Sequence, residues 1–187
     1  MIGLIVAAGV LVVLVVWALA SYNRFVRQDH YIDNSWSNVE TELQRRYELI
    51  PNLVATVRAY ADHEQETLTN VIEARAGAAA VAQEHDPATQ EPFEQQLVRG
   101  VRQLMAVSER YPELRADERF LDLQRQLVVT EDRIQAARRL FNGNVRDYNS
   151  RVESVPSAIV ARATGYGRRD YFELDEAIPR SAPEIRV

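Results

Sequence analysis

His63 and Glu64 are the residues whose types and spacing come closest to a catalytic site in this sequence. They match the first half of the HExxH motif, in which two histidines four residues apart on a helix hold zinc and the glutamate acts as a base. Thr67 stands where the second histidine is required, and only His30 and His85 remain elsewhere. The chain has no cysteine, which excludes thiolate ligands, thiol nucleophiles and disulfides. We therefore expect no metal ion and no other cofactor, and a solvated or interhelical position for His63.

Carboxylates that stand near arginines are the other candidates for acid or base chemistry. Such charges, when they flank an apolar helical stripe, more often form a solvated face or pair between helices. No G-x-S-x-G, glycine-rich phosphate loop or dinucleotide fingerprint occurs. We predict that the protein is not an enzyme and binds no small-molecule substrate. A hydrolase is the least favoured alternative, because it needs a convergent polar pocket. The residues expected to make interhelical polar pairs are Arg46, Glu64, Glu131 and Arg139.

The charge balance argues against nucleic acid as a partner. The chain has 22 basic residues, all of them arginine, against 27 acidic residues, and its net charge is −5. Binding to phosphates requires a basic face, and no segment of the sequence supplies one. We expect no nucleic-acid binding.

Residues 2–20 form an uncharged, apolar segment. As a helix this segment is about 28 Å long, close to the hydrocarbon thickness of a bilayer. Ala18-Leu19-Ala20 resembles a signal-peptidase site, but a signal peptide also needs a basic start and a shorter apolar stretch. We predict a retained anchor over residues 1–21, with a cleaved signal as the alternative. Arg24 and Arg27 follow the segment and favour a cytoplasmic location for everything after it.

Apolar residues recur with helical spacing along nearly all of the remaining chain, which predicts an all-α fold. The first stripe continues the anchor helix into the soluble part without a break (Phe25, Ile32, Trp36, Val39, Leu43, Ile50). Pro51 predicts a kink or break, with a second helix over 52–82. The expected buried face of that helix is Val54, Val57, Tyr60, Ala61, Leu68, Val71 and Ile72. Residues 84–92 contain two prolines and three acids, and predict the loop of a helical hairpin.

Two further helices are expected beyond that loop. The first runs from Phe93 to Tyr111 and is interrupted by Pro112, and Asp117 can cap the second. The second carries the longest stripe and should end at Pro156 (Phe120, Leu123, Leu127, Thr130, Ile134, Ala137, Phe141, Val145, Tyr148, Val152, Val155). A stripe this long needs partners of similar length, within the chain or from other copies. We predict a long antiparallel helical bundle over residues 22–163.

The C-terminal tail, residues 164–187, follows a short amphipathic segment formed by Ile159, Val160 and Ala163. Arginines and aromatic residues alternate in it and suit either an anionic lipid surface or packing across the bundle. The last five residues carry the only strand-like pattern. Asn142 and Asn149, which stand near Tyr148, can fix helix register if they are buried, or lie exposed.

An ordered set of motifs spans most of the chain and resembles the signature of the LemA family. These are RRYELIPNLV at 45–54, YADHE at 60–64, EAR at 73–75, YPELRA at 111–116, FLDLQ at 120–124, TEDRI at 130–134, RRLFN at 138–142, VRDYN at 145–149 and SVP at 154–156. Two residues depart from the pattern. Phe141 replaces the usual tyrosine before Asn142, and Gly143 is unfavourable inside a helix.

The resemblance implies a bacterial inner-membrane protein with one crossing, its N-terminus outside and a long helical bundle in the cytoplasm. It defines no catalytic residues. Family members are associated with membrane stress, a membrane metalloprotease and magnetosome membranes. The motif residues would be structural, with Pro51 and Pro112 setting helix ends (Arg46, Pro51, Asn52, Glu64, Pro112, Glu131, Arg139, Asn142, Tyr148, Asn149, Pro156).

Together these observations predict a membrane-anchored scaffold or adaptor that contacts the lipid bilayer, forms a homo-oligomer and binds other envelope proteins. The alternative is an adaptor that regulates a membrane protease or sensor through one specific partner.

Overall fold

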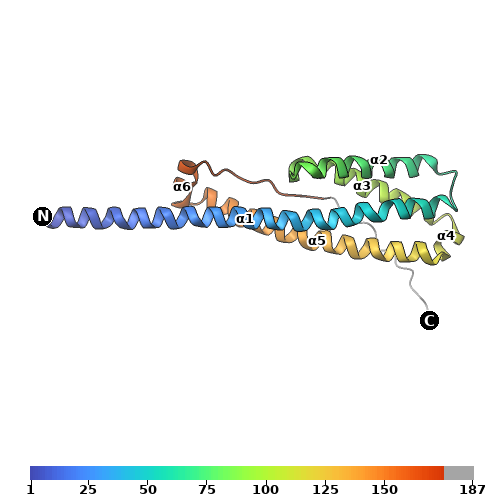
Figure 1. Ribbon diagram of the computed structural model, residues 1–187, viewed down its shortest axis with the longest axis horizontal. Coiled ribbons are helices and arrows are strands. Elements are labelled where there is room, and N and C mark those ends of the chain that lie inside the picture. Colours follow the sequence, from blue (N-terminus) through green and yellow to red (C-terminus); the bar gives the residue numbers. More distant parts are fainter. Residues whose placement is uncertain (175–187) are drawn as a thin grey trace, which may run out of the picture.

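The computed structural model describes residues 1–174, and all regular structure in that range is helical (Figure 1). The all-α fold predicted from the apolar spacing is therefore confirmed. The strand-like pattern at 183–187 lies outside the described residues. The helices are α1 (Ile2–Arg58), α2 (Gln65–Val81), the 3-10 turn η1 (Ala82–Glu84), α3 (Pro87–Ser108), α4 (Pro112–Ala116), α5 (Glu118–Glu153) and α6 (Ser157–Thr164).

One continuous helix, α1, organises the molecule. Its 57 residues extend about 85 Å. The N-terminal section protrudes beyond all other elements, and the rest runs through the bundle (Figure 1). α5 packs antiparallel along α1, the α2–α3 hairpin covers the far half, and α6 sits where the protruding section meets the bundle. The prediction that the N-terminal apolar helix continues into the bundle without a break is confirmed.

The core lies mainly between α1 and α5, where their two apolar stripes face each other. Every residue of the predicted α1 stripe is buried, and so are Phe120, Leu127, Ile134, Phe141, Val145 and Tyr148 on α5. Three residues predicted as core are exposed instead: Tyr60, Ile72 and Val155. Val155 is exposed because α5 ends at Glu153, so the helical spacing no longer sets the direction of its side chain.

The prediction that Pro51 breaks the first helix is wrong. α1 continues through Pro51 to Arg58, and the chain turns over residues 59–64 before α2 begins. Proline removes the N–H that would bond the carbonyl of Tyr47, four residues earlier. The Nε of Arg75 on α2 donates to that carbonyl at 3.1 Å instead. Ile50 and Leu53, on either side of the proline, are fully buried. Tertiary contacts thus override the local preference.

The predicted loop over 84–92 is shorter than expected. Only His85 and Asp86 separate η1 from α3. The Asp86 carboxylate accepts the Thr89 N–H at 3.1 Å, and Pro87 occupies the first helical position, where its missing N–H costs nothing. The prediction of a hairpin turn at this place is confirmed. The predicted cap of the last long helix is also confirmed, because Asp117 accepts the N–H of Phe120 at 2.8 Å.

Candidate functional site

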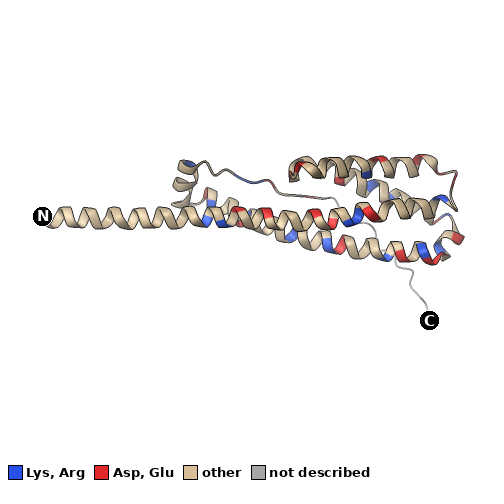
Figure 2. Cartoon of the chain, viewed as in Figure 1, with Lys and Arg blue, Asp and Glu red and all other residues tan. Residues whose placement is uncertain are grey.

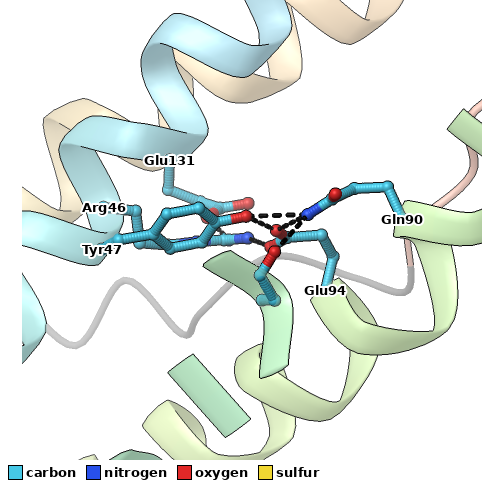
Figure 3. A network of polar contacts seen from close by, with 6 residues as sticks. Arg46, Tyr47, Gln90, Glu94 and Glu131 are labelled. Carbon is cyan, nitrogen blue, oxygen red and sulfur yellow. Dashed lines mark hydrogen bonds and ion pairs between the residues drawn. The ribbon is translucent and has the colours of Figure 1, made fainter. Parts of the chain in front are cut away.

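A buried network of polar side chains lies between α1, α3 and α5 (Figure 3). It consists of Arg46 and Tyr47 from α1, Gln90 and Glu94 from α3, and Glu131 from α5, and is called the Arg46 network below. All five side chains are buried in the core. Arg46 and Tyr47 are adjacent on α1 and both bind Glu94 on α3, and Arg46 also reaches Glu131 on α5.

The guanidinium of Arg46 joins three helices. Its Nη1 donates to Glu131 Oε2 at 3.1 Å, and its Nη2 donates to Glu94 Oε2. A guanidinium presents its donors in a rigid planar fork, which suits the simultaneous binding of two carboxylates from different directions. Arg46 therefore fixes the positions of α3 and α5 relative to α1.

Glu94 is the acceptor at the centre of the network. Its Oε1 accepts from the Tyr47 hydroxyl and, at 2.6 Å, from Gln90 Nε2. Gln90 Nε2 also lies 2.8 Å from the Tyr47 hydroxyl oxygen and 3.2 Å from the carbonyl oxygen of Ala78 on α2. Both Glu94 oxygens are thus bound by donors, as a carboxylate without access to water requires.

The protonation states follow from burial and from the neighbouring charges. Burial works to lower the pKa of Arg46, but the charges of Glu94 and Glu131 outweigh it and raise that pKa above its ordinary value. Burial and the Glu94 charge raise the pKa of Tyr47 far above its ordinary value. Arg46 is therefore cationic and Tyr47 is a neutral donor at physiological pH.

The fourth helix joins the network through the backbone. The Tyr47 carbonyl left free by Pro51 accepts from Arg75 on α2, as described above. Positions 46 and 47 of α1 are consequently bonded to α2, α3 and α5. This gives Pro51 a role other than ending a helix, because it opens a backbone acceptor to a side chain from another helix.

Replacing Arg75 with Ala is expected to destabilise the protein by about 1–3 kcal/mol, because the Tyr47 carbonyl would lose the donor that replaces the missing N–H of Pro51 in a partly buried place. In a Pro51→Ala background the loss should be much smaller, since the alanine N–H at position 51 can bond that carbonyl within the helix. Denaturant unfolding of the two single variants and the double variant measures this coupling. Equal costs of Arg75→Ala in both backgrounds would refute the assigned role of Pro51.

The network is sealed from solvent, and this limits its chemistry. Arg46 and Glu94 have almost no exposed surface, so a substrate cannot reach them in this conformation. Among residues 1–174, no three His, Asp or Glu side chains converge on a possible metal position, and His63 lies exposed at the turn before α2. The arrangement suits a structural role, in which polar contacts hold the helices together.

A second set of polar contacts holds the start of the C-terminal tail against α5. The Asn149 side chain exchanges two hydrogen bonds with the backbone of Arg169, both 2.9 Å long. Asn142 does the same with Phe172, at 2.9 and 3.0 Å. The two asparagines are seven residues apart on a helix, and their partners in the tail are three residues apart in extended chain. Both separations are about 10 Å, so each asparagine lies opposite its partner.

The side chains of the tail complete this attachment. Phe172 is fully buried and meets the Trp36 ring edge-on at 5.0 Å between centroids. The guanidinium of Arg169 lies within 3 Å of carboxylate oxygens of Asp29 and Asp33 on α1. Up to residue 174, therefore, the tail packs across the bundle, one of the two roles considered for it.

The other predicted site residues are distributed over the molecule. Glu64 pairs with Arg110 at 2.8 Å and so joins the turn before α2 to the end of α3. Arg139 lies exposed on α5 and does not join the Arg46 network, and Asn52 is exposed on α1. Pro112 begins α4, and Pro156 precedes α6. Tyr148 is buried against Phe25, with ring centroids 6.1 Å apart.

Sequence reasoning missed Tyr47, Arg75, Gln90 and Glu94. A signal for two of them was available. Gln90 and Glu94 stand seven and three residues before Leu97, which places both on the apolar face of α3. Two polar residues on such a face, one turn apart, indicate a buried polar contact. Arg75 gave no such signal, because its partner is a backbone carbonyl on another helix.

The chain matches the family model described as LemA family over residues 35–186, which covers the bundle and the tail and leaves out the N-terminal segment. It is 26% identical to magnetosome protein MamQ of Magnetospirillum gryphiswaldense, over 94% of this chain and 74% of that protein. Magnetosome protein MamQ 2 of Paramagnetospirillum magneticum is also 26% identical, over 83% of this chain and 65% of that protein.

Protein LemA of Metamycoplasma hominis is 22% identical, over 82% of this chain and 69% of that protein. The motifs of the Arg46 network and of the tail attachment lie within the matched range, residues 35–186. The match covers well over half of the sequence, and the chain therefore belongs to the LemA family.

Proposed function

We propose that this protein is a membrane-anchored scaffold whose helical bundle assembles with other copies at the inner face of the bacterial inner membrane. One observation carries the proposal. α1 runs without interruption from an uncovered apolar section into the core of the bundle, so the proposed anchor and the bundle share one continuous helix. The names of the relatives are not enzyme names, and we assign no catalytic step.

The uncovered section of α1 supports a membrane anchor. The apolar section is strongly hydrophobic, with a mean hydropathy of 3.0, and none of its residues is buried by the described chain. Such a surface is unfavourable in water and favourable in a bilayer. Trp17 and Ala18 pack against the core, which ties the end of the apolar section to the folded domain. This continuity supports retention of the segment.

The predicted orientation is testable with reporters fused to the C-terminus. Arg24 and Arg27 follow the apolar section, and positive charges next to a span favour the cytoplasmic side. A reporter that is active only in the cytoplasm should give signal when it follows Val187, and one that is active only in the periplasm should not. The reverse pattern would place the bundle outside.

Self-assembly is supported by the geometry of the anchor and by an exposed apolar face. Copies that share one membrane plane present their rigid bundles in the same orientation, which favours cyclic association through different faces. Val129, Ala136 and Leu140 lie exposed on one face of α5, with spacings of seven and four residues, and the exposed Arg133 stands between them on the same face. Anchoring in one membrane raises the local concentration of other copies of the protein, so we propose a second copy as the partner that covers this face.

Cysteine cross-linking tests this assembly, because the chain has no native thiol. Tyr22 is partly exposed just beyond the apolar section. Tyr22→Cys should form cross-linked species under oxidation, and pairs of Tyr22→Cys with Leu140→Cys should form ladders larger than dimers. Ladders that persist as the protein is diluted with lipid indicate a specific assembly. Loss of all cross-links on dilution would indicate random collisions and favour the adaptor with one partner.

A further inference from the structure

The corner between α5 and α6 carries apolar side chains that the bundle does not cover. Val155 is 81% exposed and Ile159 is 64% exposed. The opposite side of α6 is buried, with Ala158, Val160 and Ala161 packed against the core. α6 therefore carries apolar side chains on its buried and its outward face, and Ile159 lies on the outward face beside the exposed Arg162.

Side-chain contacts place this corner at the level where α1 leaves the apolar section. Phe25 contacts Tyr148 on α5, and its ring stacks on Tyr166, just after α6, at 5.2 Å. α5 is antiparallel to α1 and ends at Glu153, five residues beyond Tyr148, so its C-terminal end lies about 7 Å nearer to the apolar section than the level of Phe25. Figure 1 shows α6 beside α1 at this junction.

The charges around the corner differ from those of the rest of the chain. Residues 17–28 and 150–168 together contain five arginines and one acidic residue, Glu153, whereas the whole chain has a net charge of −5. Figure 2 shows arginines here on α1 and α6, beside an N-terminal section without charge. Arg168 pairs with Glu153 at 3.0 Å, while Arg24, Arg27 and Arg162 lie exposed.

Other features of the junction suit a lipid interface. Trp17 and Tyr22 lie on either side of the end of the apolar section, and such rings favour the headgroup level of a bilayer. Ile159 and Arg162 are one turn apart on the outward face of α6, so the arginine can reach phosphate groups while the isoleucine enters the acyl boundary.

We propose that the α5–α6 corner is a second membrane contact, in which Val155 and Ile159 insert into the interface of an anionic bilayer and Arg24, Arg27 and Arg162 bind lipid phosphates. The contact continues the anchor surface of α1 and would fix the tilt and rotation of the bundle relative to the membrane. The proposal depends on α1 spanning the bilayer, but not on self-assembly.

Depth-dependent quenching tests the contact in the full-length protein, reconstituted into vesicles of phosphatidylglycerol and phosphatidylcholine. Single substitutions Val155→Cys, Ile159→Cys, Gly9→Cys and Ile72→Cys are labelled with an environment-sensitive fluorophore. Ile72 is the matched control, because it is an apolar residue 41% exposed on α2, which lies far from the protruding section of α1 (Figure 1). Lipids that carry a spin label near the headgroup should quench the probes at 155 and 159 several-fold more than the probe at 72.

The other probes separate the possible failures. A probe at Gly9 should be quenched by spin labels deep in the acyl region, which reports insertion of α1. If the probe at 9 is quenched while those at 155 and 159 match that at 72, the second contact is refuted and the anchor is retained. If the probe at 9 is not quenched either, the anchor is refuted as well. Arg162→Glu should reduce quenching at 159, and unchanged quenching would refute the binding of phosphate by that arginine.

Discussion

Replacing Arg46 with Met is expected to destabilise the bundle by about 3–5 kcal/mol, because it leaves two buried carboxylates without their cation. Glu94 and Glu131 come from different helices, and Arg46 is the group that binds both. Denaturant unfolding of the full-length protein in detergent, followed by circular dichroism, measures the loss. A loss this large is a considerable part of the stability of an ordinary domain.

Matched variants separate the buried charge from other effects. Arg45→Met removes a partly exposed arginine that lies 3.7 Å from Glu42, and should change stability by no more than about 0.5 kcal/mol. Adding Glu94→Gln and Glu131→Gln to Arg46→Met should recover part of the loss, because no charge is then buried. If Arg46→Met unfolds at the same denaturant concentration as the wild type, the network contributes nothing to stability.

Ile134→Asp is expected to cost several kcal/mol, since it places a charge without a partner at a fully buried position in the middle of α5. Ile134 lies in the interface between α5 and α1, which contains the main part of the core. The loss of stability should therefore appear as cooperative unfolding at a lower temperature. Arg133→Asp, at the exposed neighbouring position, is the control and should have a small effect. Equal melting temperatures for the two variants would mean that the stripe is not the core.

The main helices were predictable because their apolar residues repeat with the helical period. Ile32, Leu43 and Ile134 are buried where the stripes place them. The same reasoning failed where the apolar spacing continues beyond the last helical residue. Val155 continues the apolar spacing of α5 but follows the last helical residue, Glu153. The helical period therefore does not predict the direction of the Val155 side chain.

Local rules also failed where a distant contact overrides them. Proline alone predicts a break at position 51, and the contact that stabilises the continuous helix comes from Arg75 on another helix. The attachment of the tail was hidden for a similar reason. Asn142 and Phe172 are 30 residues apart, and one member of each of their two hydrogen bonds is a backbone group, which leaves no residue-type pattern to detect.

The mass of the full-length protein in mild detergent or lipid nanodiscs is the most direct test of the scaffold model. A single chain has a mass of 21.3 kDa. Rigid anchors that share one plane and an exposed apolar face on α5 predict a defined assembly larger than a dimer, and Leu140→Asp should shift it toward smaller species. A strictly monomeric mass over the whole accessible concentration range would contradict self-assembly and leave the adaptor with one partner as the better model.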